Sequence, residues 1–470
     1  MREPPASTGR EGLGHTLEAR LTIPEPVREL MDALWSAGHS AYVVGGSLRD
    51  DLLERPPADW DLATDARPDQ IQAIFPDALY ENRFGTVTVR RDGRAYEVTT
   101  FRTDVDYADF RRPTRVEFGE SIEDDLARRD FTVNALAWGA EAVDGGGLAH
   151  AAFVDPHGGM ADLRSRTLRA VGAPEARFRE DALRMIRAVR LAATLDFRID
   201  DETFAAIRGS SGLAAHLSGE RVASELDKLM HAARPSIGLR LMGSSGLLAV
   251  VLPELASQRG VPQNKIEGED LWDHTLRTVD AVPADRPVVR LAALLHDVGK
   301  PPTQADGHFY QHEVVGAEVA EDILRRLHTP RAVSDRVVHL VRQHMFRYEP
   351  EWTDTAIRRF IAKVRLPAID DLLSLREADN VGSGLSRDAG DLPELRGRIG
   401  TETQAGLVLD RNALAVDGDD LMKELGLPPG PELGRLIDRL VERVISDPAL
   451  NDRETLIDIA RTETLTDESR

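Results

Sequence analysis

The chain has no cysteine among its 470 residues, which excludes disulfide bonds and zinc sites built on thiolates. It also has no run of about eighteen or more apolar residues, so a membrane-spanning helix is excluded. The first residues combine proline, glycine and charge without an apolar stretch, and they predict no secretory signal. We therefore expect a cytoplasmic protein without a membrane partner.

Positive charge is scarce, because 59 lysines and arginines stand against 80 acidic residues and the formal net charge is −21. This balance is unfavourable for binding nucleic acid, since contacts to phosphate dominate such binding. The basic residues are concentrated, however: residues 161–190 hold eight arginines against four acids, and six more arginines lie within residues 102–129. Local basic surfaces of this kind are compatible with RNA.

The length predicts several domains, because a single core rarely extends past about 250–300 residues. Residues 1–22 are expected to be a disordered tail. Residues 23–155 mix strand and helix patterns and predict an α+β head with a mixed sheet. Beyond the head, apolar residues recur three and four apart. This period predicts an all-helical remainder, divided into a neck and body (156–260), a further helical domain (265–385) and a C-terminal helical region (386–470).

A glycine pair at the end of a predicted strand is the first chemical motif. Residues 41–44 predict the strand, Gly45 and Gly46 a turn, and residues 48–53 the start of a helix. Arg49 on this helix is expected to bind the nucleotide together with the glycine turn. Backbone amides at such a turn approach phosphates closely, because glycine has no side chain and a helix N-terminus is electropositive. The spacing is neither the dinucleotide fingerprint nor a P-loop.

Two aspartates follow the glycines closely and predict a metal site. If Trp60 lies on a strand, Asp59 and Asp61 project from the same face of it. Paired carboxylates suit Mg²⁺, which completes its shell with water and substrate phosphates. Glu97, on the next predicted strand but one, is a candidate third carboxylate, or alternatively a solvent-facing strand residue. A phosphate cradle beside paired carboxylates is the equipment of metal-dependent nucleotidyl transfer.

A second basic motif, R-R-D-F-T-V-N-A, begins at Arg128. Guanidinium groups present planar donor pairs to phosphate oxygens, and an asparagine amide can bond a ribose hydroxyl. We therefore expect Arg129, Asp130 and Asn134 to bind nucleotide, although an arginine pair is often only a solvated helix face.

A third motif, E-D-A-L-R, predicts selection of the base. Asp181 and Arg184 are three residues apart on a predicted helix and would be neighbours on its surface. A carboxylate acceptor beside a guanidinium donor complements cytosine and adenine, each of which offers an amine beside a ring acceptor. Guanine and uracil would instead place a carbonyl against the carboxylate. The alternative is an ordinary ion pair on one helix. Arg187 and Arg190 are expected to contact the triphosphate or anchor the helix.

A separate set of histidines and aspartates lies in the predicted helical domain. The adjacent pair His296-Asp297 ends an apolar helical run, where unpaired polar groups would be costly. Imidazoles combined with carboxylates suit divalent transition metals. The candidate ligands are His274, His296, Asp297, His312, His344 and Asp379.

The head and neck motifs closely resemble those of the class II tRNA nucleotidyltransferase and poly(A) polymerase family, and the histidine set resembles HD-superfamily phosphohydrolases. The resemblance implies template-independent addition of C, C and A to the 3′ end of tRNA from CTP and ATP. It implies that Asp59 and Asp61 hold Mg²⁺, that Glu97 is catalytic, and that the HD domain binds a second divalent metal. It also implies that residues 104–125, which predict a long polar loop, form the family's flexible loop.

Three alternatives remain. A poly(A) polymerase on the same scaffold usually carries a G-R-R-F-R-like segment, whereas residues 82–88 read N-R-F-G-T-V-T and favour the tRNA type. The HD domain would be the principal activity if the transferase head were degenerate. A non-catalytic RNA-binding scaffold would not need paired carboxylates beside a phosphate cradle. The complete motif set argues against the last two.

Overall fold

The computed structural model describes residues 21–80, 85–107, 113–119, 121–143, 147–148, 150–263, 265–404 and 411–467. Nearly all of the expected tail and residues 82–84 of the tRNA-type segment therefore lie outside the described residues. The chain forms two compact units, Met1–Pro253 and Glu254–Arg470. Within the described residues, no helix has the length and apolar character needed to cross a membrane.

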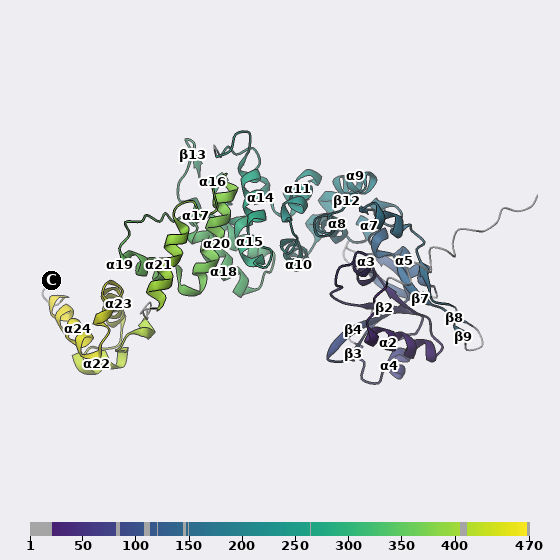
Figure 1. Ribbon diagram of the computed structural model, residues 1–470, viewed down its shortest axis with the longest axis horizontal. Helices are drawn as coiled ribbons and strands as arrows, with labels where there is room; N and C mark the ends of the chain where they lie inside the picture. The colour runs from purple at the N-terminus through teal and green to yellow at the C-terminus, as the bar shows by residue number, and fades with distance from the viewer. Residues whose placement is uncertain are drawn as a thin grey trace, which may run out of the picture. The chain divides into compact units, whose positions relative to one another are not determined.

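The head is built on a six-stranded mixed sheet with the strand order β10-β7-β1-β2-β4-β3. Figure 1 labels four of these strands, β2, β3, β4 and β7. Neighbouring strands are antiparallel except for β2 and β4, which run parallel. The sheet confirms the α+β fold class. Its strands are β1 (Ala41–Val44), β2 (Asp61–Thr64), β3 (Thr86–Arg91), β4 (Arg94–Thr100), β7 (Ala137–Ala140) and β10 (Ala152–Val154).

Helices pack against the central strands β1 and β2, which are buried along nearly their whole length. On one face, Ile122 and Leu126 of α5 pack into a core with Tyr42, Val44 and Ala63 of β1 and β2. Helix α2 has a fully buried apolar stripe and contacts both β1 and α4, which lies beside it in Figure 1. The head helices are α2 (Glu25–Ser36), α3 (Gly46–Leu52), α4 (Pro68–Ile74) and α5 (Ile122–Ala127), followed by a short 3₁₀ turn, η1 (Thr132–Asn134).

The prediction of a long loop over residues 104–125 is wrong for most of that stretch. Strands β5 (Arg102–Tyr107) and β6 (Pro113–Phe118) pair antiparallel as a separate two-stranded sheet, and α5 begins at Ile122. A two-stranded sheet of its own need not bury one face, so its sequence need not alternate apolar and polar residues. A second short pair, β8 (Ala142–Val143) and β9 (Gly147–Leu148), follows β7.

The neck is helical, and its central helix is α8 (Leu183–Leu195), which packs against α10 and α11. Apolar residues three and four apart along α8 are buried, as its period predicts. The remaining elements are α6 (Gly159–Arg164), β11 (Thr167–Leu168), α7 (Pro174–Glu180), β12 (Arg198–Ile199), α9 (Asp201–Ser210), η2 (Ser211–His216), α10 (Gly219–Met230), α11 (Pro235–Ser245), α12 (Leu247–Val251) and α13 (Pro253–Ala256).

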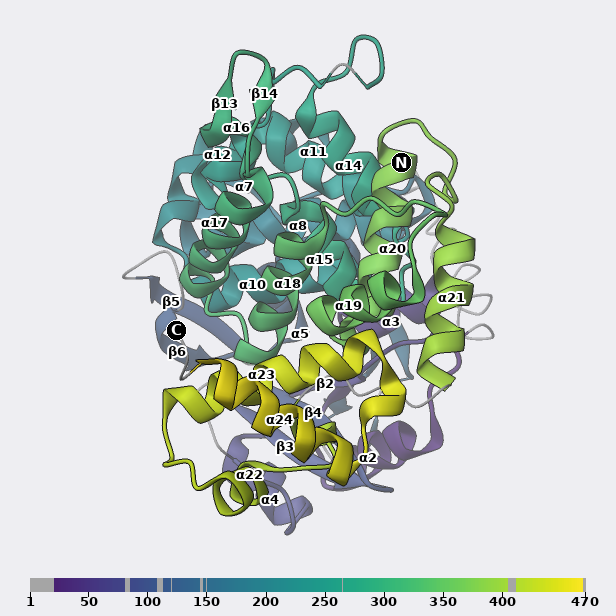
Figure 2. The same cartoon turned by 90° about the vertical axis from the view of Figure 1, so that its left-hand side faces the viewer.

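The second unit is a bundle in which α14, α15, α18 and α20 pack against one another (Figure 2). Its elements are α14 (Leu271–Ala281), α15 (Pro287–Leu295), α16 (Lys300–Thr303), β13 (Gln304–Ala305), β14 (His308–Phe309), α17 (His312–Arg326), α18 (Arg331–Gln343), α19 (Asp354–Val364), α20 (Leu366–Gly382) and α21 (Leu392–Gln404).

The C-terminal helices share a core of their own, which includes Leu421, Leu436, Leu440 and Leu456. They are α22 (Gly418–Leu425), α23 (Pro431–Ser446) and α24 (Arg453–Asp467), preceded by η3 (Arg411–Ala413) and with η4 (Pro448–Leu450) between the last two. Pro428, Pro429 and Gly430 lie in the connection between α22 and α23.

Candidate active sites

The glycine turn forms as predicted and brings a helix start to the end of β1. Gly45 has φ +79°, and a Cβ atom at this position would lie 2.5 Å from Nη1 of Arg129. The positive φ favours glycine, and a side chain here would displace the guanidinium of Arg129. Helix α3 begins at the next residue, Gly46. The turn thus presents backbone amides and Arg129 on the same side of the head.

Three carboxylates gather beside this turn. Asp61 is the first residue of β2, where it pairs with Val44 of β1 on one side and with Glu97 of β4 on the other. Asp59 lies two residues before β2, so only one of the two aspartates is on the strand. Burial raises the pKa of Asp61, the charge of Arg129 opposes this, and the charges of Glu97 and Asp59 raise it further.

The donor set of the head fits a divalent cation. It consists only of carboxylate oxygens. Burial, and after it the charges of Glu97 and Asp59, raise the pKa of Asp61 against the opposing charge of Arg129, so a bound cation would stabilise its ionised form. Among the described residues, both groups of three or more candidate ligands with atoms within 4.8 Å of one another lie in the second unit. The three head carboxylates are therefore farther apart than ligands around a bound ion.

A buried polar chain connects the glycine turn to the neck. Arg49 of α3 donates from Nη1 to Oδ1 of Asn134 at 2.6 Å, and Asn134 donates from Nδ2 to Oδ1 of Asp130 at 2.9 Å. Arg187 of α8 donates from Nε to the other carboxylate oxygen of Asp130 at 2.8 Å. Burial opposes ionisation of Asp130, but Arg187 and Asn134 together hold its pKa below the usual range. These four candidate nucleotide-binding residues are thus positioned by one another.

The predicted helix through Asp181 and Arg184 is interrupted, which corrects the expected arrangement. Asp181 is in an extended conformation after α7, and α8 begins only at Leu183. Oδ1 of Asp181 accepts a hydrogen bond from the amide of Leu183 at 3.0 Å, an Asx-type turn that ends one helix and starts the next. Apolar residues keep recurring every three or four positions through this turn, so the sequence pattern did not indicate that the helix is interrupted.

Asp181 and Arg184 each have another partner in the structure. Oδ2 of Asp181 accepts from Nη2 of Arg221 in α10 at 2.6 Å. Arg184 donates from Nη1 to Glu180 at 2.6 Å and from Nη2 to the carbonyl of Arg128 at 2.8 Å. The two side chains are therefore held separately, from α10 and from the end of α5, rather than as a mutual ion pair.

Two supporting residues on α10, Arg221 and Glu225, were missed by the sequence analysis. Glu225 is 3% exposed, accepts from Nε of Arg190 at 2.5 Å, and lies 3.9 Å from Nη1 of Arg187. A sequence signal existed, because Glu225 falls on the apolar face of its helix beside Val222 and Leu226. An acid in such a position needs a buried cationic partner.

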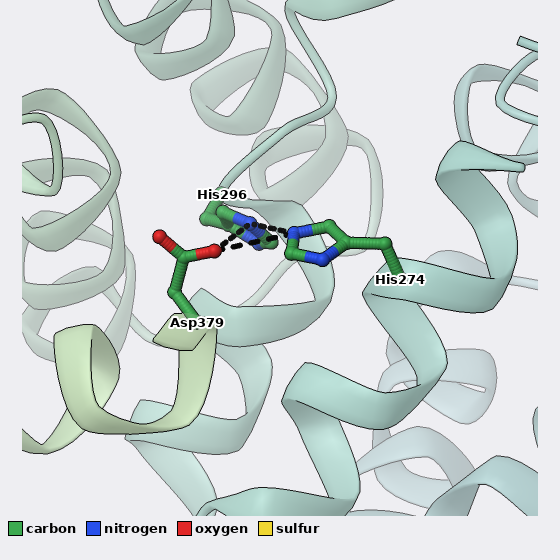
Figure 3. Close-up of side chains that lie close together, drawn as sticks. All are labelled: His274, His296 and Asp379. Atoms are coloured by element: carbon green, nitrogen blue, oxygen red, sulfur yellow. Dashed lines mark hydrogen bonds and ion pairs between the residues drawn. The ribbon is translucent and has the colours of Figure 1, made fainter. Parts of the chain in front are cut away.

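All six predicted HD ligands converge in the second unit. They come from α14, α17 and α20 and from the C-terminal ends of α15 and α18, and each is at most 8% exposed. Two groups have ligand atoms within 4.8 Å of one another: His274 with His296 and Asp379 (Figure 3), and Asp297 with His312 and His344. Oδ2 of Asp297 also lies 3.3 Å from Nε2 of His274 and 3.1 Å from Nε2 of His296, which joins the groups.

Three of the four histidines have Nδ1 bound to backbone, which leaves Nε2 for the centre. Nδ1 of His296, His312 and His344 each contact the backbone carbonyl three residues earlier, at 2.7–3.0 Å. This arrangement is typical of metal-binding histidines. Nε2 of His312 and of His344 are buried and make no hydrogen bond, as expected of nitrogen atoms that await a metal ion. The donor set therefore fits divalent metal.

Charges at this centre are balanced by lysines. Nζ of Lys300 lies 2.7 Å from Oδ2 of Asp297, and Nζ of Lys265 lies 3.6 Å from Oδ1 of Asp379. Burial opposes ionisation of Asp297, but His296 and Lys300 hold its pKa well below the usual range. Burial lowers the pKa of His296 and of Lys265.

A polymerase-type head with a glycine turn and paired acids, a helical neck and an HD centre together define a nucleotidyltransferase with an HD domain. Family models match accordingly: the poly A polymerase head domain over residues 41–169, the probable RNA- and SrmB-binding site of polymerase A over 196–259, and the HD domain over 267–382.

The chain belongs to the CCA-adding enzyme family. It is 33% identical over 440 residues to the CCA-adding enzyme of Streptococcus thermophilus (strain CNRZ 1066), a match that covers 91% of this chain and 94% of that protein. The Geobacillus stearothermophilus CCA-adding enzyme is 33% identical over 429 residues, with 91% and 94% covered. A crystal structure of the Bacillus stearothermophilus CCA-adding enzyme in complex with CTP superposes with a TM-score of 0.72 at 30% identity, covering 95% of this chain and all of that one.

The chain is therefore a tRNA nucleotidyltransferase, and its two domain types imply the use of divalent metal. Neither the poly(A) polymerase alternative nor the alternative of a mainly hydrolytic HD enzyme is favoured by these relatives.

Proposed function

We propose that the head adds C, C and A to the 3′ end of tRNA from CTP and ATP, with Mg²⁺ held by Asp59 and Asp61. The observation that carries this proposal is the position of Asp61, which pairs with the last residue of β1 immediately before the glycine turn and with Glu97 on its other side. Carboxylates and phosphate-binding amides thus meet at one edge of the sheet.

Each side chain of the head has a distinct role in this proposal. Asp59, Asp61 and Glu97 form the carboxylate group, and a bound Mg²⁺ would neutralise triphosphate charge and activate the 3′-hydroxyl of the tRNA. The backbone at the Gly45-Gly46 turn approaches the phosphates, and the donor there is the amide of Gly46, because the amide of Gly45 donates to the carbonyl of Leu136. Arg129 supplies positive charge next to Asp61, and its buried Nε makes no hydrogen bond, which leaves a donor for an anion.

Base selection is assigned to Asp181 and Arg184, with Arg187 and Arg190 behind them. Both selecting side chains are held by residues of other segments, as preorganised recognition requires. Arg49, Asp130 and Asn134 join this region to the glycine turn and position the nucleotide-binding arginines. Protein side chains would thereby replace a nucleic-acid template.

The domain assignment follows from these roles. Catalysis belongs to the head (23–155), base selection and RNA binding to the neck and body (156–260), and metal-dependent hydrolysis to the HD domain (265–385), with a C-terminal helical region (386–470). The HD proposal rests on the six buried ligands and on Lys265 and Lys300 beside them. A divalent transition metal there, together with two lysines, would suit a phosphate ester.

One incubation tests the main proposal. The protein is mixed with tRNA that lacks its 3′ CCA and with each single nucleoside triphosphate, and the products are separated by length. We expect CTP alone to add two residues, ATP to add one residue only after both cytidines are in place, and UTP and GTP to add none. Repeated addition from ATP alone would instead identify a poly(A) polymerase.

A further inference from the structure

The row of carboxylates on the head sheet continues into a polar surface on β3 that the proposed function does not use. Asp61 and Glu97 are register partners, and Glu97 is in turn the register partner of Thr88 on β3. Partners on neighbouring strands point to the same face of a sheet, so the three side chains form one row across β2, β4 and β3. Because neighbouring strands are about 5 Å apart, the backbone of Thr88 lies roughly 10 Å from that of Asp61.

Arg90 extends this surface toward the hairpin turn. It stands two residues after Thr88 on β3 and therefore points to the same face. Arg90 and Glu97 are exposed and Thr88 is half-buried, whereas the alternate residues Val87 and Val89 are buried on the other face. Within the part of the chain that the structure describes, the side chains of Thr88, Arg90 and Glu97 make no hydrogen bond or ion pair with another residue. These three residues form an open surface with free polar groups.

The same face of the sheet is closed over β1 and β2. Ile122 and Leu126 of α5 pack there beside Val44, the last residue of β1. The glycine turn follows directly at Gly45, so the proposed triphosphate site lies at the β1 end of the row. Asp61 pairs with Val44 on one side and with Glu97 of the open surface on the other. The carboxylates therefore stand between the glycine turn and the open surface.

The chemistry of the transfer decides which substrate takes each side. The 3′-hydroxyl oxygen of the tRNA forms a bond to the α-phosphorus of the nucleotide, and the bond from that phosphorus to the oxygen bridging to the β-phosphate breaks. Pyrophosphate leaves with the bridging oxygen, and the hydroxyl proton passes to solvent. The attacking and leaving oxygens lie in line on opposite sides of the phosphorus. Because the leaving pyrophosphate lies toward the glycine turn on β1, the attacking hydroxyl comes from the side of β4 and β3.

We propose that Thr88 and Arg90 form the subsite for the 3′-terminal nucleotide of the tRNA, with Thr88 on its ribose and Arg90 on a backbone phosphate. This inference rests on the proposed function, because it takes the glycine turn as the triphosphate site. A threonine hydroxyl both donates and accepts, as a ribose hydroxyl does. A guanidinium is always charged and presents paired donors to phosphate oxygens. On a chain with a net charge of −21, an exposed arginine beside the carboxylates is a distinct attraction for RNA.

The test measures the two substrates separately on the full-length protein. KM for tRNA that lacks CCA is determined at saturating CTP and at several salt concentrations, and KM for CTP is determined at saturating tRNA. The variants are Arg90→Gln, Arg90→Lys, Arg90→Glu and Thr88→Val. Arg94→Gln is the matched control, because Arg94 is an exposed arginine of the same hairpin that stands three residues before Glu97 and so points to the opposite face. Circular dichroism reports folding of every variant.

We expect Arg90→Gln to raise KM for tRNA roughly tenfold, the lower end of the value of a hydrogen bond to a charged group, and to leave KM for CTP unchanged. The slope of log KM for tRNA against log salt concentration should fall by about 0.7, because one phosphate contact is lost. Arg90→Lys should keep the wild-type slope, and Arg90→Glu should raise KM for tRNA further. Thr88→Val should lower kcat/KM for tRNA severalfold without a change in the salt slope, because its hydroxyl carries no charge.

Several outcomes overturn the inference. If Arg90→Gln and Arg90→Glu behave as Arg94→Gln does, the open surface does not bind the tRNA. A rise in KM for CTP as large as that for tRNA would place the triphosphate at Arg90 and reverse the order of the substrates. An unchanged salt slope in Arg90→Gln would mean that Arg90 contacts no phosphate. Should Thr88→Val fail to fold, Thr88→Ala takes its place, and an unchanged kcat/KM there removes Thr88 from the subsite. A wild type that adds no CMP would contradict the proposed function itself, which is a separate result.

Discussion

Glu97 on β4 lies directly opposite Asp61 on β2, in the same parallel register that pairs Leu62 with Val98. Paired residues of neighbouring strands project to the same face of a sheet, so two carboxylates from distant parts of the sequence share one side of the head. Asp59 approaches from the chain before β2 and adds to the negative charge that raises the pKa of Asp61. This is an arrangement that a divalent cation stabilises.

The first prediction concerns that carboxylate group. Asp61→Asn should lower incorporation of both CMP and AMP by roughly a thousandfold, because a metal ion contributes several kcal/mol to such a transition state. Binding of tRNA, measured by gel shift, should be largely retained. Asp69→Asn, which changes an exposed acid on α4, is the control. Substantial activity in Asp61→Asn and in Asp59→Asn would remove the transferase assignment.

The second prediction concerns base choice. Asp181→Ala or Arg184→Ala should permit incorporation of UMP or GMP, because these two side chains supply the complement of the Watson–Crick edge. The measurement compares kcat/KM for all four triphosphates on the same tRNA. A uniform fall in rate with selectivity intact would count against base recognition at this segment.

The third prediction separates the two metal sites. His296→Ala combined with Asp297→Ala should abolish any metal-dependent phosphodiesterase or phosphatase activity and spare nucleotide addition, because these ligands belong to a different compact unit from the head carboxylates. Thermal stabilisation by Mn²⁺, Co²⁺ or Ni²⁺, about 2.7 kcal/mol at a hundredfold excess over Kd, should also disappear.

Both activities are measured on one preparation, with circular dichroism to confirm folding. Loss of nucleotide addition in a folded double variant would show that the domains are coupled. A wild type with neither hydrolase activity nor metal-dependent stabilisation would make the HD centre structural.

The fourth prediction concerns pH and the buried Asp130. Burial opposes its ionisation, but Arg187 and Asn134 hold its pKa below the usual range. A depressed pKa contributes stability that is present above the unfolded value of about 3.9 and is lost as the pH falls through the folded value. Asp130→Asn should therefore cost about 3 kcal/mol at neutral pH, because Arg187 is left without its carboxylate.

Urea unfolding at a series of pH values checks this. The difference in unfolding free energy between wild type and Asp130→Asn should shrink below about pH 4, because the carboxylate of the unfolded chain gains its proton there while that of the folded protein stays ionised. A difference that stayed constant across this range would mean that the charge of Asp130 does not stabilise the fold.

Local features of the site were predictable from the sequence. The strand, glycine turn and helix around Gly45 formed as expected, because their signals lie within a few neighbouring residues. The turn between β3 and β4 has a local origin too, because Asp92 and Gly93 both have positive φ and are residue types that adopt it readily. The six HD ligands were recognised by residue type and order, and the structure brings them together.

Other features had no local signal. The interruption of the helix at Asp181 lies where apolar residues still recur every three or four positions. The pairing of β5 with β6 does not require apolar and polar residues to alternate along the strands. Glu225 was visible only as an acid on an apolar helix face, without any indication of which cations it would meet.

The sequence by itself determined which residue types are available, where the glycine turn lies, and that a helical bundle follows an α+β head, since periodicity and glycine geometry are local properties. Only the tertiary structure decided which charged side chains contact one another. Strand register placed Glu97 beside Asp61, and helix packing placed Arg221 against Asp181 and Glu225 against Arg190. Such partners lie tens of residues apart, and their pairing depends on how buried surfaces fit, which no short stretch of sequence encodes.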